Sequence, residues 1–388
     1  MRRLLISAAV IAAIAPAAAT ASTGEPSLEA RAILPADATW PAPFPGVIDT
    51  DPAPAPGATQ PVGGFSALLD AGHGRYWAMP DNGFGNKLNS KSFLLRVYKV
   101  RPNWETKRGG PGTVDILTAV TLRDPDRQVP FAIVNETTPV RLLTGGDFDI
   151  ESMRIARDGT WWFGEEFGPF IVHTDATGKV LDSPTPTPGI FSPDNPYGRA
   201  PNIARSNGFE GMALSADGRT LYPILEGAVT GDDPLDRRVF EFDVRARRFT
   251  GRTWTYRMSR PDTLVSDATV LDRKRIIVLE RDNGQGPAAQ WKRAFLIDTP
   301  GRQAVLEKEQ IVDLLALRDR KAISLPARPG DFGLGDPFSF PYVTVEAVLP
   351  VSRDRLAFVN DTNFGSTGRN PALPDYSDFI GVEVPGLG

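Results

Sequence analysis

One acidic pattern recurs five times along the chain. Each copy has a polar or acidic residue among small neighbours, an apolar stretch, a turn, a second apolar stretch and a further acidic residue. Internal repetition at intervals of several tens of residues is typical of stacked or radially repeated units. The five copies are FSALLDAGHGRYWAMPDNGF from Phe65, DIESMRIARDGTWWFGEEFGPF from Asp149, GFEGMALSADGRTLYPILEGAV from Gly208, VSDATVLDRKRIIVLERDNGQG from Val265 and TVEAVLPVSRDRLAFVNDTNFG from Thr344.

Each copy has the pattern of a β-hairpin. Turns such as Asp158-Gly159 reverse the chain between two apolar stretches of strand length. The first acidic residue then starts one strand and the second ends the returning strand, so both lie at the same edge. The first position holds Ser66, Glu151, Glu210, Asp267 and Glu346. The second position holds Asp81, Glu165, Glu226, Glu280 and Asp361.

A β-propeller is the most economical all-β architecture for these hairpins. If they form the inner strands of blades around an axis, the acidic residues gather at one mouth of the central channel. Six blades are preferred over five or seven, because the long gaps after Asp81 and after Glu280 have room for a degenerate copy. A helical pattern is present only around residues 310–320. A pair of β-sandwiches and a parallel β-helix are the alternatives.

The N-terminus has the pattern of an export signal. Residues 1–21 combine a basic start, an apolar run and small residues that end at Ala21, where cleavage is expected. Residues 22–62 are rich in Pro and Ala, with one strand expected near residues 28–34 that would close the last blade, and residues 63–388 form the propeller. No later apolar run is long enough to span a bilayer. A periplasmic or extracellular protein is therefore expected.

Composition removes several classes of function. The net charge of -4 and the lack of a basic stretch argue against nucleic-acid binding. There is no cysteine, and His73 and His173 are the two histidines, so a zinc site is not expected. Carboxylates that converge on one mouth need a counter-charge, and calcium, which prefers oxygen ligands, is the simplest one. The alternative is a structural role, in which the acids accept hydrogen bonds from loop backbone.

The chain resembles the phytase-like family, which is described by the esterase-like activity of phytase. The resemblance extends from about Gly63 to Val384. It implies a secreted propeller that hydrolyses phosphate or carboxylic esters. The matching pieces are DFDIESMRIARDGTWWFGEEFGPFI from Asp147, NGFEGMALSADGRTLY from Asn207, VLERDNGQGPAAQWKRAFLID from Val278 and FPYVTVEAVLPVSRDRLAFVNDTNFG from Phe340.

These patterns predict a site in which each charged residue has a role. Glu210 and Glu280 are expected to be catalytic. The expected metal ligands are Glu151, Glu165, Glu346 and Asp361, and the residues expected to bind a small anionic ester are Arg205, Arg281, Lys292 and Arg369. The predicted function is metal-assisted ester hydrolysis at the channel mouth. A non-catalytic binding propeller and a lactonase-like metal enzyme are the alternatives.

Overall fold

The computed structural model describes residues 24–48 and 55–388, and almost all of their regular structure is β-strand. The predicted signal peptide, with its cleavage near Ala21, lies outside the described residues. One short 3-10 helix, η1 (Gly286–Ala288), is the only helix in this part of the chain. Within the same residues, no helix is long and apolar enough to cross a membrane.

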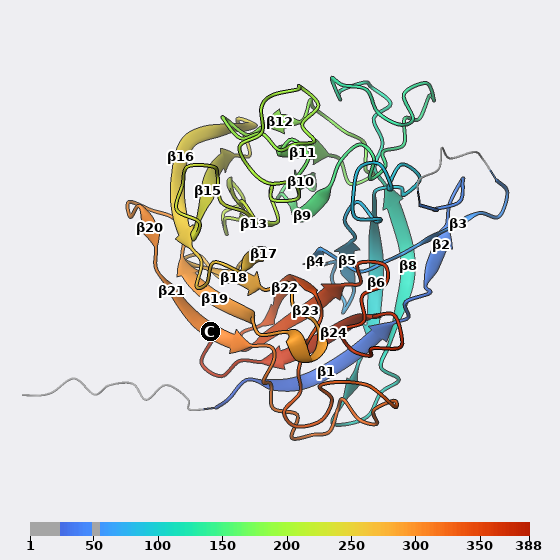
Figure 1. Cartoon of the computed structure of the whole chain (residues 1–388), viewed down its shortest axis with the longest axis vertical. Helices are drawn as coiled ribbons and strands as arrows, with labels where there is room; N and C mark the ends of the chain where they lie inside the picture. The colour runs from blue at the N-terminus through green and yellow to red at the C-terminus, as the bar shows by residue number, and fades with distance from the viewer. Residues whose placement is uncertain (1–23, 49–54) are drawn as a thin grey trace, which may run out of the picture.

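Five inner strands surround a central axis (Figure 1). Each of them contacts the next along the chain, and the last contacts the first, so that the strands close a ring. The inner strands are β4 (Ala67–Asp70), β9 (Ile150–Ile155), β13 (Gly211–Leu214), β17 (Leu264–Val270) and β22 (Thr344–Ser352). A closed ring of sheets that radiate from an axis is a β-propeller.

Each inner strand begins a blade of antiparallel strands. We number the blades 1 to 5 in the chain order of their inner strands. Blade 1 continues outward through β5 (Tyr76–Met79), β6 (Arg96–Asn103) and β8 (Thr113–Thr121). Blade 2 continues through β10 (Trp161–Glu165), β11 (Phe170–Thr174) and β12 (Thr185–Pro186). Blade 3 continues through β14 (Thr220–Ile224), β15 (Asp236–Asp243), β16 (Arg248–Arg257) and β20 (Val305–Leu306). Blade 4 continues through β18 (Arg275–Arg281), β19 (Lys292–Asp298) and β21 (Lys308–Asp313).

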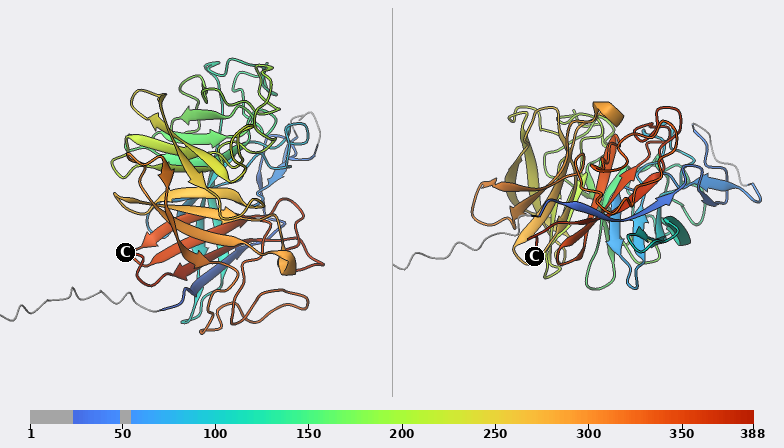
Figure 2. Two further views of the ribbon diagram at one scale, coloured as in Figure 1. Left: turned by 60° about the vertical axis from the view of Figure 1, so that its left-hand side comes forward. Right: turned by 90° about the horizontal axis from the view of Figure 1, so that it is seen from below.

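The last blade joins the two ends of the described chain. In blade 5, β22 is followed by β23 (Arg355–Asp361) and β24 (Ser377–Glu383), and β1 (Ser27–Leu34) pairs antiparallel with β24. Figures 1 and 2 show this blue strand beside the red ones. A short hairpin of β2 (Thr39–Pro41) and β3 (Thr59–Pro61) follows β1 in the sequence. The two-residue strand β7 (Glu105–Thr106), which lies between β6 and β8 in the sequence, pairs antiparallel with β1.

The core is divided into five apolar clusters, one between each pair of neighbouring blades. Adjacent tryptophans on β10 illustrate how a blade serves two of them. Trp161 packs in the cluster between blades 1 and 2, and Trp162 packs in the cluster between blades 2 and 3. Strand alternation places neighbouring side chains on opposite faces, so a blade with apolar residues on both faces is buried on both sides.

A group of buried charges ties the N-terminal strand to blade 5. Asp378 on β24 is fully buried and lies 3.0 Å from the Nε of Arg31 on β1. Its other oxygen lies 3.3 Å from an Nη of Arg369 and accepts a hydrogen bond of 2.9 Å from the hydroxyl of Tyr342. One carboxylate is therefore the shared counter-charge of two buried guanidinium groups.

The predicted all-β propeller is confirmed. The described residues form five blades, which lies within the predicted range of five to seven and is one fewer than the preferred six. The long gap after Asp81 holds the outer strands of blade 1 and a loop, and the gap after Glu280 holds the outer strands of blade 4 and a loop. The helical pattern at residues 310–320 was wrong, because that segment completes β21 and then turns. The predicted domain boundary at residue 62 stays a prediction. The strand β1 precedes this boundary in the sequence, yet it pairs with β24 in blade 5.

Candidate functional site

A cavity of about 350 Å³ opens at the end of the channel where the inner strands begin and the second strands end. Seven of the eight carboxyl groups that line it belong to side chains that are at most 7% exposed. We call this cavity the acidic mouth. Its carboxylates are Asp81, Asp149, Glu151, Glu166, Glu210, Glu226, Glu346 and Asp361.

The hairpin geometry places most of these residues as the repeats predict. Among the residues given roles from the sequence, the acidic mouth brings together Glu151, Glu210, Glu346, Asp361, Arg205 and Arg281. Four blades contribute acids, and blade 4 contributes Arg281 at the end of β18. The mouth therefore forms where strands that are far apart in the sequence meet around the axis.

Glu165, a predicted metal ligand, lies outside the acidic mouth. A β-bulge between Gly164 and Glu165 shifts the register of β10 against β9. The Glu165 carboxylate accepts hydrogen bonds from the backbone N–H groups of Phe167 (2.8 Å) and Gly168 (2.7 Å). Glu166, the next residue, lines the cavity instead. The structure therefore gives Glu165 the backbone-bonding role that the sequence left open.

Glu280, predicted to be catalytic, also lies outside the mouth. Its carboxylate accepts hydrogen bonds from the Tyr256 hydroxyl (2.7 Å) and the Trp291 Nε1 (3.0 Å), and it contacts the Lys308 ammonium. Because side chains alternate along β18, its neighbour Arg281 faces the mouth.

Two predicted substrate-binding residues are part of the interior structure. The Nζ of Lys292 lies 2.8 Å from the Val343 carbonyl and 2.9 Å from an Asp282 carboxylate oxygen. Burial lowers the pKa of Lys292 to about 8. Arg369 is fully buried and donates to the carboxylate of Asp378. Neither residue lines the acidic mouth, so neither is proposed to bind substrate.

The acids in the mouth are short of positive charge. Arg281 is the one buried cation among the lining residues, and its Nη2 lies 2.9 Å from Glu226, 3.6 Å from Glu210 and 3.7 Å from Glu346. Burial, followed by repulsion from Asp361, raises the pKa of Glu346 to about 8. Burial also raises the pKa values of the other seven carboxyl groups. Such a site favours either protons or a bound cation.

Two groups of carboxylate oxygens lie close enough to share a cation. The first is formed by Asp81, Asp149 and Glu151, and the second by Glu151, Glu210 and Glu346. In each group the oxygens lie within 4.8 Å of one another, and Glu151 belongs to both. A separate observation supports the first group: one carboxylate oxygen of Asp149, Oδ1, is buried and has no hydrogen-bond partner among the described residues.

The sequence reasoning missed Asp149 and Glu166. Asp149 opens the second repeat copy, two residues before the aligned Glu151, and Glu166 directly follows the aligned Glu165. The sequence held a signal for both residues, because Asp149 lies in the acidic segment DFDIE and Glu166 is the second member of the pair EE. The alignment of the repeats nevertheless assigned one acid to each position, which hid the second member of each pair.

We expect Asp149→Asn to weaken calcium binding about tenfold, because it removes the charge of a ligand whose oxygen has no other partner. Titration calorimetry of chelator-treated protein measures the effect. Asp147→Asn is the matched control, since Asp147 accepts hydrogen bonds from the backbone of Val134 and Thr144, and its loss should lower stability only. Wild-type affinity in Asp149→Asn would remove this residue from the cation site.

The raised pKa values predict a pH dependence of stability in chelator. Glu346 has a pKa of about 8 in the folded protein against 4.5 for the unfolded residue. The folded state therefore binds more protons between these values, and the free energy of unfolding falls as pH rises through this range. Urea unfolding in chelator at several pH values measures the slope. A free energy of unfolding that stays constant or rises from about pH 5 to pH 8 would contradict the raised pKa values of the carboxyl groups in the folded protein.

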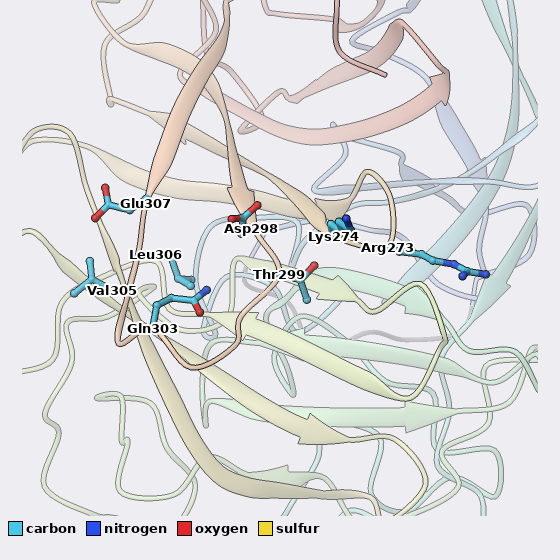
Figure 3. Close-up of a pocket in the computed structure, with 8 residues that line it drawn as sticks. All are labelled: Arg273, Lys274, Asp298, Thr299, Gln303, Val305, Leu306 and Glu307. Carbon is cyan, nitrogen blue, oxygen red and sulfur yellow. The ribbon is translucent and has the colours of Figure 1, made fainter. Parts of the chain in front are cut away.

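A larger cavity of about 580 Å³ lies at the opposite end of blades 3 and 4 (Figure 3). Its lining mixes the basic Arg273 and Lys274 with the acidic Asp298 and Glu307. Leu306 is its one buried lining residue. This surface offers no buried titratable group, so its size gives no reason to place chemistry there.

Comparison with known sequences identifies one family. The family described as phytase-like, with the esterase-like activity of phytase, matches residues 60–364. A curated relative from Arthroderma benhamiae (strain ATCC MYA-4681 / CBS 112371) bears the name "Uncharacterized secreted protein". It is 28% identical over a region that covers 55% of this chain and 56% of that protein. The match thus spans about half the length of this relative.

Solved structures give more distant similarities. A luciferin-regenerating enzyme has 11% identity and a TM-score of 0.40, with coverage of 83% of this chain and 78% of that chain. A GH43 β-1,3-galactosidase has 9% identity and a TM-score of 0.46, with coverage of 87% and 59%. Regucalcin from Agrobacterium tumefaciens strain C58, a calcium-binding protein, has 13% identity and a TM-score of 0.38, with coverage of 89% and 96%. Similarities at this level carry no argument about function.

Proposed function

Because the chain belongs to the phytase-like family, we propose that it is an exported hydrolase that cleaves a phosphate or carboxylic ester at the acidic mouth with the help of a hard cation. The observation that carries this proposal is the concentration of eight carboxyl groups around a single buried arginine in one cavity. Buried carboxylates in such excess need a partner. The secreted relative and the N-terminal signal pattern support a location outside the cytoplasm.

The side chains of the mouth fit calcium. They offer carboxylate oxygens together with the neutral amide oxygens of Asn207, Asn283 and Asn363, which are the ligand types that calcium prefers. No histidine lines the cavity in the described part of the chain. The unpartnered oxygen of Asp149 is a free donor atom. The two groups that share Glu151 are the proposed ligands, and Asp361 is an outer candidate because both its oxygens already accept backbone N–H groups.

A bound calcium ion would polarise an ester oxygen and lower the pKa of a coordinated water molecule. The protein itself supplies the positioning groups. The Nε of Arg281 is buried without a hydrogen-bond partner among the described residues, so this guanidinium can donate to an anionic ester. Arg205 lines the rim of the same cavity, where it forms an ion pair with Asp194.

Glu210 is the proposed proton-transfer residue. Burial and the charges of Glu226 and Glu346 raise the pKa of its carboxyl group well above the ordinary value. A carboxyl group with a raised pKa can accept a proton from an attacking water molecule and return it to a leaving alcohol. The position of Glu210 beside Arg281, at 3.6 Å, places this group next to the proposed anion-binding donor.

A hydrolysis assay tests the proposal. The chelator-treated mature protein is assayed with and without calcium on a phosphomonoester, a phosphodiester, a carboxylic ester and a lactone. We expect calcium-dependent turnover of a phosphate or carboxylic ester, with loss in Glu210→Gln and retention in the control Glu241→Gln, which changes a carboxylate outside the mouth. Calcium binding without turnover would favour the non-catalytic binding propeller, and turnover of the lactone alone would favour the lactonase-like enzyme.

A further inference from the structure

A third cavity, of about 300 Å³, lies between blades 2 and 3 on the propeller face opposite the acidic mouth. Its position follows from the turns that line it. The turns at Asp158-Gly159 and Asp217-Gly218 join the first two strands of blades 2 and 3, at the far end from the acids. We call this cavity the basic pocket. Its basic and aromatic lining residues are Arg157, Trp162, His173, Arg219, Arg245 and Arg247.

The basic pocket has an excess of positive charge. Four arginines line it, against one carboxylate, Asp158. The side chains of two of these arginines already have partners within the protein. Arg157 donates a hydrogen bond to the backbone carbonyl of Ala216 at 2.8 Å, and Arg247 forms an ion pair with Asp182 at 2.7 Å. The side chains of the other two, Arg219 and Arg245, form no hydrogen bond or ion pair with any described residue.

A buried histidine at this pocket has one nitrogen in use and one free. The Nδ1 of His173 lies 2.6 Å from a carboxylate oxygen of Asp182, and the imidazole stacks on Trp162 with ring centroids 3.8 Å apart. Burial lowers the pKa of His173, which favours the neutral ring, and the Asp182 carboxylate beside Nδ1 favours the tautomer that carries its proton on Nδ1. Its Nε2 is then a hydrogen-bond acceptor.

Neither Nε2 of His173 nor Nε1 of Trp162 has a hydrogen-bond partner within the part of the chain that the structure describes. His173 is 5% exposed and Trp162 is 2% exposed. A buried polar atom without a partner costs about 1–3 kcal/mol. The Nε2 of His173 accepts a hydrogen bond, and the Nε1 of Trp162 donates one. A hydroxyl group on a ligand can both donate and accept, so it can bond to either nitrogen.

We propose that the basic pocket binds hydrogen phosphate. The unpaired guanidinium groups of Arg219 and Arg245 bind its anionic oxygens, and its P–OH group donates to the Nε2 of His173. Arginine suits this task because its planar fork matches the oxygens of a phosphate group. The pocket is separate from the acidic mouth, and the proposal does not depend on the chain being a hydrolase.

Calorimetric titration with inorganic phosphate tests the proposal in chelator, where the acidic mouth holds no cation. We expect saturable binding at one site, weakened at least about tenfold in Arg219→Gln/Arg245→Gln because two charged donors are lost. The control Arg108→Gln/Arg302→Gln removes the same charge from other exposed positions and should bind as the wild type does. Absence of saturable binding, or equal loss in both double variants, would overturn the proposal.

Sulfate provides a second test, since it has similar geometry but no O–H group at neutral pH. We expect the wild-type protein to prefer phosphate to sulfate by about tenfold, because sulfate leaves the acceptor of His173 unsatisfied. His173→Phe keeps an aromatic ring against Trp162 and removes Nε2, so this preference should disappear. Equal affinity of the wild-type protein for the two anions would show that the pocket selects for charge alone, and would overturn the role of His173.

Discussion

Calcium affinity is expected to fall at least about 100-fold in Glu151→Gln, the largest effect on binding of any single substitution in the acidic mouth, because affinity depends on the number of charged ligands. Glu151 is the one carboxylate that belongs to both groups of closely spaced oxygens. Its replacement therefore removes an ionised oxygen from each group. Titration calorimetry with calcium, after treatment with a chelator, gives the affinity and the stoichiometry.

The controls for Glu151→Gln separate a shared ligand from general loss of charge. Asp81→Asn and Glu346→Gln each change one group and should weaken binding less than Glu151→Gln does. Glu165→Gln changes a buried carboxylate of the same blade outside the cavity, so it should lower stability and leave the calcium affinity unchanged. If Glu151→Gln binds calcium as tightly as the two single-group variants, the shared role of Glu151 is wrong.

Replacing Asp378 with alanine should lower the free energy of unfolding by about 3–5 kcal/mol, the range observed when one partner of a buried ion pair is removed. Asp378 is fully buried and pairs with Arg31 and Arg369. Its loss leaves two buried guanidinium groups without their common counter-charge. The same substitution weakens the attachment of β1 to β24 in blade 5.

Urea unfolding of Asp378→Ala beside Asp115→Ala measures this effect. Asp115 pairs with Arg101 at 2.7 Å, but both side chains are more than 40% exposed. Solvent screens a surface pair of this kind, so it contributes little to stability and the control should unfold close to the wild type. Similar losses in the two variants would mean that the buried charge group does not hold blade 5 together.

The repeats carry enough information to predict the architecture. Apolar stretches of strand length on either side of turns such as Asp158-Gly159 predict hairpins, and their recurrence predicts a propeller. The number of blades was less accessible, because a gap in a repeat pattern is filled equally well by a sixth hairpin or by outer strands and loops. After Glu280 the chain uses the gap for β19 and β21 of blade 4, for β20 of blade 3 and for an irregular segment.

The acidic mouth could be predicted in outline, with errors of a single residue. Glu165 and Glu280 fit the repeat pattern, yet the cavity is lined by the residues that follow them, Glu166 and Arg281. Successive side chains on a strand point to opposite faces, so an offset of one residue reverses the environment. The bulge at Gly164 and Glu165 produces such an offset, and bulges leave no clear mark in the sequence.

The predicted basic residues show a second limit of sequence reasoning. Lys292 and Arg369 follow acidic motifs closely, which suggested a place at the mouth. In the structure, both are buried among carbonyl and carboxylate oxygens of the protein itself. The arginines of the basic pocket, by contrast, belong to separate turns, Arg157 in blade 2 and Arg219 and Arg245 in two turns of blade 3, and the fold brings these turns to one cavity.

The central claim is that the acidic mouth binds a hard cation, and thermal unfolding across a calcium titration tests it most directly. A ligand that binds the folded state alone raises the unfolding temperature as its concentration increases. We expect calcium to raise the unfolding temperature of the chelator-treated wild-type protein, and to have little effect on Glu151→Gln. An unfolding temperature of the wild-type protein that does not change with calcium would contradict the claim.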